Sequence, residues 1–326
     1  MKNEYIYAVT RVHGQESNLL NAQDLDQLLA AHDVAACYRQ LAEKGWGSKD
    51  QSIDDSDALM KQEREKTYSL IRELLGDLAP LNVLFCENDF HNLKAAIKLV
   101  YSEQDLKNPE QYFLHPCIVS PDDVLSAVRQ HDYIKLPTAL AEAGANANEI
   151  LAQTGNGQAC EMAIDYAALL AIDAEGKRSG VALLKRYAEQ KVDTANIKAA
   201  VRACRMGKGR DFLVRAIAPA GSLYIKGLID AAESGLEDIY EYLRGTQYAD
   251  AVDSLRESLS AFECWRDNRL MESLRPQKYE YFSIEPLAAY VLARETEIAM
   301  VRLILSAKIN SLSDALIRKR WRLLYV

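Results

Sequence analysis

Residues 88–98 read NDFHNLKAAIK, and about a hundred positions later residues 193–202 read DTANIKAAVR. Both stretches follow the pattern D-x-x-N-[LI]-K-A-A, with aliphatic residues continuing at the spacing of one helical face. A third, degenerate copy lies in RETEIAMVRLIL (294–305), where Arg294 takes the Asp position and Glu297 the Asn position. The aliphatic residues that follow the Asn position are 104 and then 101 positions apart. This repetition predicts a chain built from three similar modules.

The composition indicates that the modules are helical. Hydrophobic residues make up 49% and charged residues 26% of the 326 residues, which is the balance of a folded globular protein. Only 8 prolines and 15 glycines interrupt a chain rich in alanine, leucine, glutamate, lysine and arginine, which favour helix. We therefore expect an all-α protein with pseudo-threefold character, whose modules span residues 1–110, 111–217 and 218–326.

Proline and glycine mark the predicted module boundaries. NPEQYFLHPCIVSPDD (108–123) carries three prolines and opens the second module, with a helix start at Ser120-Pro121-Asp122. AIAPAGSLY (216–224) opens the third module. Residues 45–57, 143–158 and 245–248 are expected to be loops between helices, and residues 228–243 are expected to carry one buried helical face.

Charge and cysteine content limit the partners and the compartment. The net charge of −8 and the pI of about 5.3 argue against nucleic acid and against anionic lipid as the main partner. The six cysteines are scattered and form no C-x-x-C pair, which is typical of reduced core residues. The N-terminus lacks the apolar region of a signal peptide, and no stretch approaches the roughly 20 apolar residues of a membrane span. We expect a cytosolic protein, or one bound to a membrane complex from outside.

The motifs that could support catalysis are weak. Asp54, Asp55 and Asp57 in IDDSD invite comparison with magnesium-binding aspartate clusters, but the spacing is too short and no second acidic motif appears. GNG (155–157) and GKG (207–209) do not extend to a phosphate-binding pattern and are expected to be turns. The histidines have no partner at metal-ligand spacing and are His13, His32, His91, His115 and His131. We therefore predict no catalytic residue, no metal site and no cofactor.

The polar residues of the repeated pattern have two interpretations. Asp89 and Asp193 can cap or orient a helix, and Asn92 and Asn196 can tie that helix to an adjacent loop. This structural interpretation is favoured. The alternative is a ring of polar side chains facing a central cavity, and with Glu297 these residues are then candidates for an interface with another protein.

The C-terminus, SDALIRKRWRLLYV (313–326), is basic and amphipathic. Such an ending can dock on a partner or a lipid surface. More often the cations complement the dipole of the last helical turn while the aliphatic residues pack inward, and we favour this second interpretation.

The same residues resemble a known family. FSIEPLAAYVLARETEIAMVRLILSAKINSLSDALIRKRWRLLYV (282–326) is similar to the C-terminal region of the C subunit of bacterial and archaeal V-type (A-type) ATPases, which corresponds to the d subunit of the vacuolar ATPase. The resembling elements are PLAAY, then E-x-E-I-x-x-V-R-x-I-L-x-x-K, then I-R-x-R and a final YV. The stretches NDFHNLKAAIK and YIYAVTRVHGQESNLL (5–20) also resemble the family, so that the likeness covers nearly the whole chain.

The resemblance implies a rotor protein without an active site of its own. Family members form a funnel of three helical domains. The base of the funnel sits on the cytoplasmic face of the membrane proteolipid ring, the c-ring, and its pocket receives the central shaft, which is made of the D and F subunits. Torque then couples ATP hydrolysis or synthesis to transport of H+ or Na+. The degenerate third copy argues against equal roles for the three modules.

Two other function classes remain open from the sequence. One is a helical-repeat scaffold that binds other partners through a concave surface. The other is a helical metal-dependent enzyme that uses the Asp54–Asp57 loop.

Overall fold

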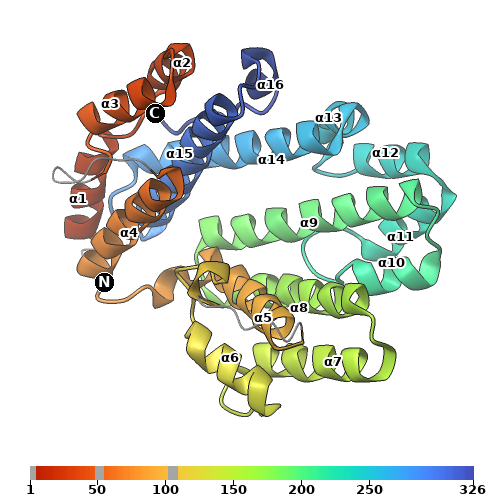
Figure 1. Ribbon diagram of the computed structural model, residues 1–326. Helices are drawn as coiled ribbons and strands as arrows, with labels where there is room; N and C mark the ends of the chain where they lie inside the picture. Colours follow the sequence, from red (N-terminus) through yellow and green to blue (C-terminus); the bar gives the residue numbers. More distant parts are fainter. Residues whose placement is uncertain (1–4, 48–54, 102–108) are drawn as a thin grey trace. The chain divides into compact units, whose positions relative to one another are not determined.

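The computed structural model describes residues 5–47, 55–101 and 109–326, and within these ranges it contains helices and no strand (Figure 1). The all-α prediction is confirmed. The chain packs into two compact units: unit 1 comprises Met1–Leu78 and Asp253–Val326, and unit 2 comprises Ala79–Val252. The three predicted modules and their boundaries stay a prediction.

Unit 1 is organised around one long helix near the C-terminus, α15 (Glu285–Ile309). Helix α15 contacts α1, α2, α3, α4, α16 and the 3-10 helix η4. Because it has neighbours on several sides, α15 is apolar on several faces. With α13 (Val252–Glu257) at its boundary, the unit also contains α1 (Ile6–Glu16), α2 (Ala22–Ala30), α3 (Val34–Glu43), α4 (Ser56–Leu75), α14 (Leu259–Leu274), η4 (Arg275–Tyr279) and α16 (Asp314–Arg318).

The core of unit 1 joins residues from both ends of the chain. From α15 it takes the buried side chains of Ile298, Val301 and Ile304, and from α2 and α3 it takes leucines such as Leu25 and Leu41. Pro286 lies in the first turn of α15, where a missing backbone N–H costs nothing. Burial of this aliphatic face therefore fixes the N-terminal helices against the C-terminal helix.

Unit 2 is organised around α9 (Ala182–Arg205), which contacts α8, α10, α11 and α12. Helices α8 and α9 run side by side (Figure 1), and a Cβ added at Gly176 of α8 would lie 2.4 Å from the Cβ of Ala188 of α9. The unit contains η1 (Ala79–Leu84), α5 (Cys86–Tyr101), η2 (Pro109–Tyr112), α6 (Pro121–Gln130), α7 (Thr138–Thr154), α8 (Gly157–Arg178), α9, α10 (Arg210–Ala216), α11 (Ile225–Ser234), α12 (Leu236–Arg244) and η3 (Ala249–Ala251).

Two local predictions are wrong. The expected loop over residues 143–158 is mostly helix, because α7 continues to Thr154. Gly144 does not break that helix; a Cβ there would lie 2.5 Å from the ring of Tyr133, so the glycine allows the ring to pack. The expected single helical face over residues 228–243 is two helices, α11 and α12, divided at Gly235 with a φ of 150°.

Other boundaries follow the predicted signals. Helix α6 begins at Pro121, and residues 245–248 form a turn. Asp55 caps α4 by accepting a hydrogen bond from the N–H of Asp57, and residues 48–54 of the predicted loop lie outside the described residues.

Candidate functional site

The first repeated helix, α5, uses its Asp and Asn to hold the segment that leads to α6. Asn92 donates through Nδ2 to the carbonyl of Leu114 (3.1 Å) and accepts at Oδ1 from the N–H of Leu114 (2.7 Å). Asp89 Oδ1 accepts from the N–H groups of Ile118 (2.9 Å) and Val119 (3.1 Å). Asp89 and Asn92 are both buried. We call this set of four hydrogen bonds the first latch.

The second repeated helix, α9, forms the same arrangement with the segment that leads to α11. Asn196 donates to the carbonyl of Ala218 and accepts from its N–H, both at 2.9 Å. Asp193 Oδ1 accepts from the N–H of Ser222 (2.9 Å) and of the next residue (3.3 Å). Asp193 Oδ2 accepts from the hydroxyls of Ser222 (2.5 Å) and Tyr248 (2.8 Å). We call these hydrogen bonds the second latch. Asp193, Asn196 and Ala218 are all fully buried.

The two latches share their spacing as well as their chemistry. In each, the Asn bonds a residue 22 positions later and the Asp bonds backbone N–H groups 29 and 30 positions later. The second latch also requires a glycine. Gly221 has a φ of +83°, and a Cβ there would lie 2.1 Å from Asp193 Oδ1. The sequence repeat is therefore a repeat of three-dimensional contacts.

The third copy of the pattern, on α15, also holds a segment of the chain, but with a Glu and an Arg in place of the Asn and the Asp. Glu297, at the Asn position, accepts at Oε1 from the N–H of Leu20 (2.9 Å). Arg294, at the Asp position, donates to Glu297 Oε2 and to Glu63 Oε2, both at 2.7 Å, and its guanidinium lies 5.1 Å from the centre of the Trp46 ring. Leu20 directly precedes the N-cap of α2. This third latch therefore ties the C-terminal helix to the segment in front of α2.

Arg294 is stabilised in its charged form inside the protein. Burial lowers its pKa, but Glu297, Tyr290 and Glu63 together raise it by more. Glu63 is itself shared, because its Oε1 accepts from the N–H of Gly47 (2.8 Å) and from Lys66 Nζ (2.6 Å). The network thus compensates each buried charge with a partner.

The latches show what the repeated polar residues do within the chain. Asp89, Asn92, Asp193, Asn196 and Glu297 are all buried, and their side chains bond within the chain. They tie helices to adjacent segments, as the favoured structural interpretation expects. A role of these residues at an interface with another protein stays a prediction.

Sequence reasoning missed two charged members of the third latch. Arg294 looked like a loss of the pattern, and Glu63 carried no signal of its own within α4. The available clue was the pair Arg294 and Glu297, because residues three positions apart on a helix can form an ion pair.

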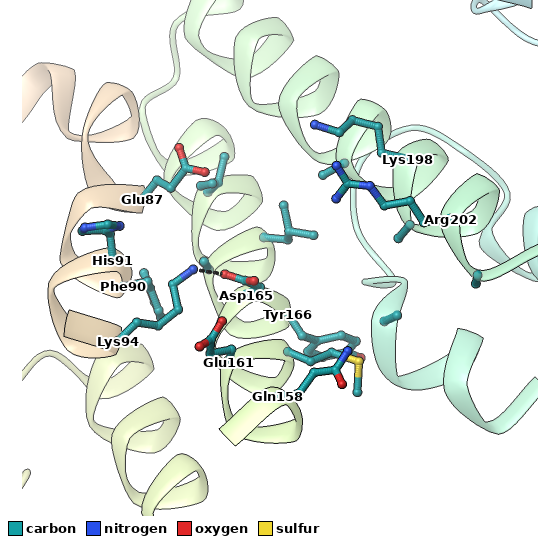
Figure 2. Close-up of a pocket in the computed structure, with 18 of the residues that line it drawn as sticks. Glu87, Phe90, His91, Lys94, Gln158, Glu161, Asp165, Tyr166, Lys198 and Arg202 are labelled. Atoms are coloured by element: carbon teal, nitrogen blue, oxygen red, sulfur yellow. Dashed lines mark hydrogen bonds and ion pairs between the residues drawn. The ribbon is translucent and has the colours of Figure 1, made fainter. Parts of the chain in front are cut away.

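A cavity of about 690 Å³ opens in unit 2 among α5, α8, α9 and α10 (Figure 2). The lysines of the repeated pattern, Lys94 and Lys198, both line it. Lys94 Nζ lies 2.5 Å from Asp165 Oδ1, and Figure 2 shows Lys198 and Arg202 across the cavity from that pair. Within the described residues, the side chain of Arg202 has no ion-pair partner.

The cavity combines charge with apolar surface. Its apolar lining includes Phe90, Met162, Leu169, Ile172, Met206 and Phe212. Met206 is 59% exposed. Aromatic residues, methionine and arginine, which are enriched at protein–protein interfaces, are thus among the residues that line the cavity.

The structure describes most of the residues that were weighed as catalytic or metal-binding candidates. Among the described residues, no group of His, Cys, Asp and Glu could hold a metal ion. Asp57 pairs with Arg302 at 2.6 Å, and Asp54 lies outside the described residues. His91 lines the cavity, with Nε2 3.3 Å from the carbonyl of Tyr112.

The two G-x-G elements are turns, as predicted. Gly155 ends α7 in a left-handed conformation, and Asn156 caps α8 by accepting from the N–H of Ala159. Gly207, with a φ of 61°, lies in the turn between α9 and α10.

The cysteines are free thiols, and three of them, Cys37, Cys86 and Cys160, are buried. Burial, with a contribution from the Asp89 carboxylate, raises the pKa of Cys86 to about 12. Burial also raises the pKa of Cys117 to about 11. These two side chains therefore remain thiols at neutral pH, which disfavours them as nucleophiles.

Part of the C-terminal segment (313–326) packs inward, in agreement with the interpretation favoured from the sequence. Arg318 pairs with Asp26 and Arg322 pairs with Asp267, both at 2.9 Å. Leu324 and Tyr325 are buried. None of the helices in the described ranges is both long enough and apolar enough to cross a bilayer.

Comparison with known proteins gives matches along most of the chain. A family model described as the ATP synthase (C/AC39) subunit matches residues 8–320, a range that includes all three latches. The C subunit of the V-type sodium ATPase of Enterococcus hirae is 20% identical over 326 residues, covering 96% of this chain and 97% of that protein.

The two amide latches make matched mutations possible. We expect Asn196→Ala to lower the free energy of unfolding by about 2–4 kcal/mol, because the backbone groups of fully buried Ala218 lose both partners. Asn92→Ala should cost less, about 1–2 kcal/mol, because Leu114 is 40% exposed and water can replace the amide. Guanidinium unfolding followed by circular dichroism measures both. Equal losses would contradict this account of the latches.

The raised pKa of Asp89 leads us to expect that the stability of the protein depends on pH. Burial is the main cause that raises its pKa from 3.8 to about 6, although the N–H groups of Val119 and Ile118 oppose the shift. The folded state therefore binds this proton more tightly, and its stabilising contribution is present below about pH 4 and is lost as the pH rises towards 6. Asp89→Asn, whose Oδ1 can still accept both bonds, should be more stable than the native chain at pH 7, by at most about 3 kcal/mol.

The gain from Asp89→Asn should disappear as the pH falls to 4, and urea unfolding at several pH values measures it. Asp193→Asn is the matched control. Its amide would place an NH₂ group where Oδ2 accepts from two hydroxyls, so it should destabilise at pH 7. A pH-independent difference between Asp89→Asn and the native chain would contradict the assignment.

From the third latch we expect that replacing Arg294 lowers the free energy of unfolding by a large amount. Arg294→Ala leaves Glu63 and Glu297 buried without their common cation, and we expect the free energy of unfolding to fall by about 3–5 kcal/mol. Arg302→Ala, on the same helix, removes an exposed pair with Asp57 and should cost only about 0–1 kcal/mol. Thermal and denaturant unfolding distinguish the two; similar losses would contradict the role of the buried network.

Proposed function

Because the chain belongs to the ATP synthase (C/AC39) subunit family, we propose that it is a non-catalytic rotor subunit in the central stalk of a V/A-type ATPase. The observation that carries this proposal is the family match over residues 8–320. Membership in this family supports a stalk subunit. The role as a socket between shaft and membrane ring is our further step.

In this proposal the three helical modules form a pseudo-threefold funnel around a central pocket. The repeated latches support similar modules, because α5 and α9 each hold the segment that follows them with the same bonds at the same spacing. The cavity of unit 2, with Lys198 and Arg202 on α9, offers charged and apolar surface to the central shaft, made of the D and F subunits.

The base of the funnel binds the proteolipid c-ring from the cytoplasmic side. The protein passes torque between shaft and ring, so that ATP hydrolysis or synthesis is coupled to transport of H+ or Na+. This work needs no cofactor and no active site in the chain. It needs stiffness, which close-packed helices supply and which the buried hydrogen bonds extend to the segments between helices.

Measuring ion uptake without the chain, and again after the purified chain is added back, tests the proposal. Membrane vesicles from cells that lack the chain should lose ATP-driven uptake of H+ or Na+, while ATP hydrolysis by the catalytic subunits continues. Adding the purified chain back should restore uptake, and adding a heat-denatured sample should not. Normal ion uptake without the chain would overturn the proposal.

A helical-repeat scaffold for other partners is the alternative function. Affinity purification of the chain from intact membranes separates the two. Shaft and ring proteins in the purified complex support the rotor role, and their absence, with other proteins in their place, supports the scaffold.

A further inference from the structure

A second groove, of about 520 Å³, lies within unit 1 between the start of α14, the second half of α15 and α16. It is separate from the cavity of unit 2. Its apolar lining is Ala261, Leu303, Ala307, Leu312, Leu316 and Ile317. The short helix α16 and the residues just after it thus form one wall of a concave apolar surface.

Two leucines of this groove are exposed although a core lies next to them. Leu312 is 50% exposed and Leu316 is 53% exposed, whereas Ile317, the next residue, is 2% exposed and belongs to the core of unit 1. Helix α16 is therefore anchored by one face and presents Leu316 on another. Exposed apolar side chains gathered in a concave surface are typical of binding sites.

The cations of the basic C-terminal segment fall into two sets. Arg318 and Arg322 pair with carboxylates of the chain, at Asp26 and Asp267. Lys319 and Arg320 line the groove and are exposed, and within residues 5–47, 55–101 and 109–326 their side chains have no hydrogen bond or ion pair. Two positive charges are thus left at the rim of an apolar surface.

We propose that this groove binds an acidic amphipathic helix of a partner protein. Apolar side chains of the partner pack on Leu312 and Leu316, and its carboxylates pair with Lys319 and Arg320. This surface and its partner go beyond the proposed rotor function and do not depend on it.

Charge favours a protein over a lipid surface as the occupant. Lys319 and Arg320 are the cations of the lining, and Glu257 on the opposite wall would repel an anionic headgroup. An anionic bilayer is an extended surface that also meets the rest of a chain with a net charge of −8, whereas a helix contacts the groove alone. A helix can present carboxylates to one side of the groove only, which suits the single cationic rim.

Photocross-linking of the full chain in intact cells tests the proposal. p-Benzoylphenylalanine replaces Leu316 in the full chain, and mass spectrometry identifies the peptide to which it becomes attached. We expect one peptide with apolar residues at helical spacing and a net negative charge. In a chain that also carries Lys319→Glu and Arg320→Glu, the yield should fall about tenfold, since two ion pairs become repulsive.

The matched control carries the same change of charge elsewhere. Lys135→Glu and Lys226→Glu alter two exposed lysines of unit 2 that have no ion-pair partner among the described residues, and the cross-link should persist. Circular dichroism of each variant establishes that it is folded. Vesicles of phosphatidylcholine with phosphatidylglycerol test for lipid binding through the same two cations.

Several results would overturn the proposal. They are a cross-link to a basic peptide, to lipid or to a second copy of this chain, a yield that the double substitution leaves unchanged, and no cross-link at all. Loss of the rotor role is a different outcome, because it is measured by ion uptake and leaves this cross-link intact.

Discussion

A buried amide that bonds both the N–H and the carbonyl of one linker residue is the interaction on which the architecture depends. Asn92 does this for Leu114 and Asn196 does it for Ala218. Each segment leaves a helix, changes direction and starts another helix, so its backbone groups lack helical partners. A side chain with both a donor and an acceptor satisfies both groups, in the interior at Ala218 and at a partly exposed position at Leu114. The segments between helices thereby become as well defined as the helices.

The third latch shows how the same task is done across distant parts of the chain. Residue Leu20 lies near the N-terminus and α15 near the C-terminus, so no short covalent segment keeps them together. Here the amide is replaced by the carboxylate of Glu297, which Arg294 neutralises together with Glu63. A buried charge network of this kind tolerates loss of a partner poorly, and it therefore specifies one arrangement of the two ends. A protein proposed to transmit torque must be stiff, and this network stiffens the contact between the segment in front of α2 and α15.

The sequence predicted the fold class and the repeat, because helix propensity and helical spacing are local properties. It also predicted that Asn92 and Asn196 tie helices to neighbouring segments. It did not predict that α7 continues through Gly144, because the packing of Tyr133 on that glycine is a tertiary contact. It likewise missed the division at Gly235, since apolar residues on two successive helices can keep the same spacing. Glu63 in the third latch was beyond reach, because only folding brings α4 to α15.

Native-state hydrogen exchange at single amides tests the central claim most directly. The N–H groups of Leu114, Ala218 and Leu20 each bond to a latch side chain although none of the three residues lies in a helix. We predict that they exchange as slowly as amides in the middle of α9 and α15. Exchange as fast as that of exposed loop amides would contradict the role assigned to the latches.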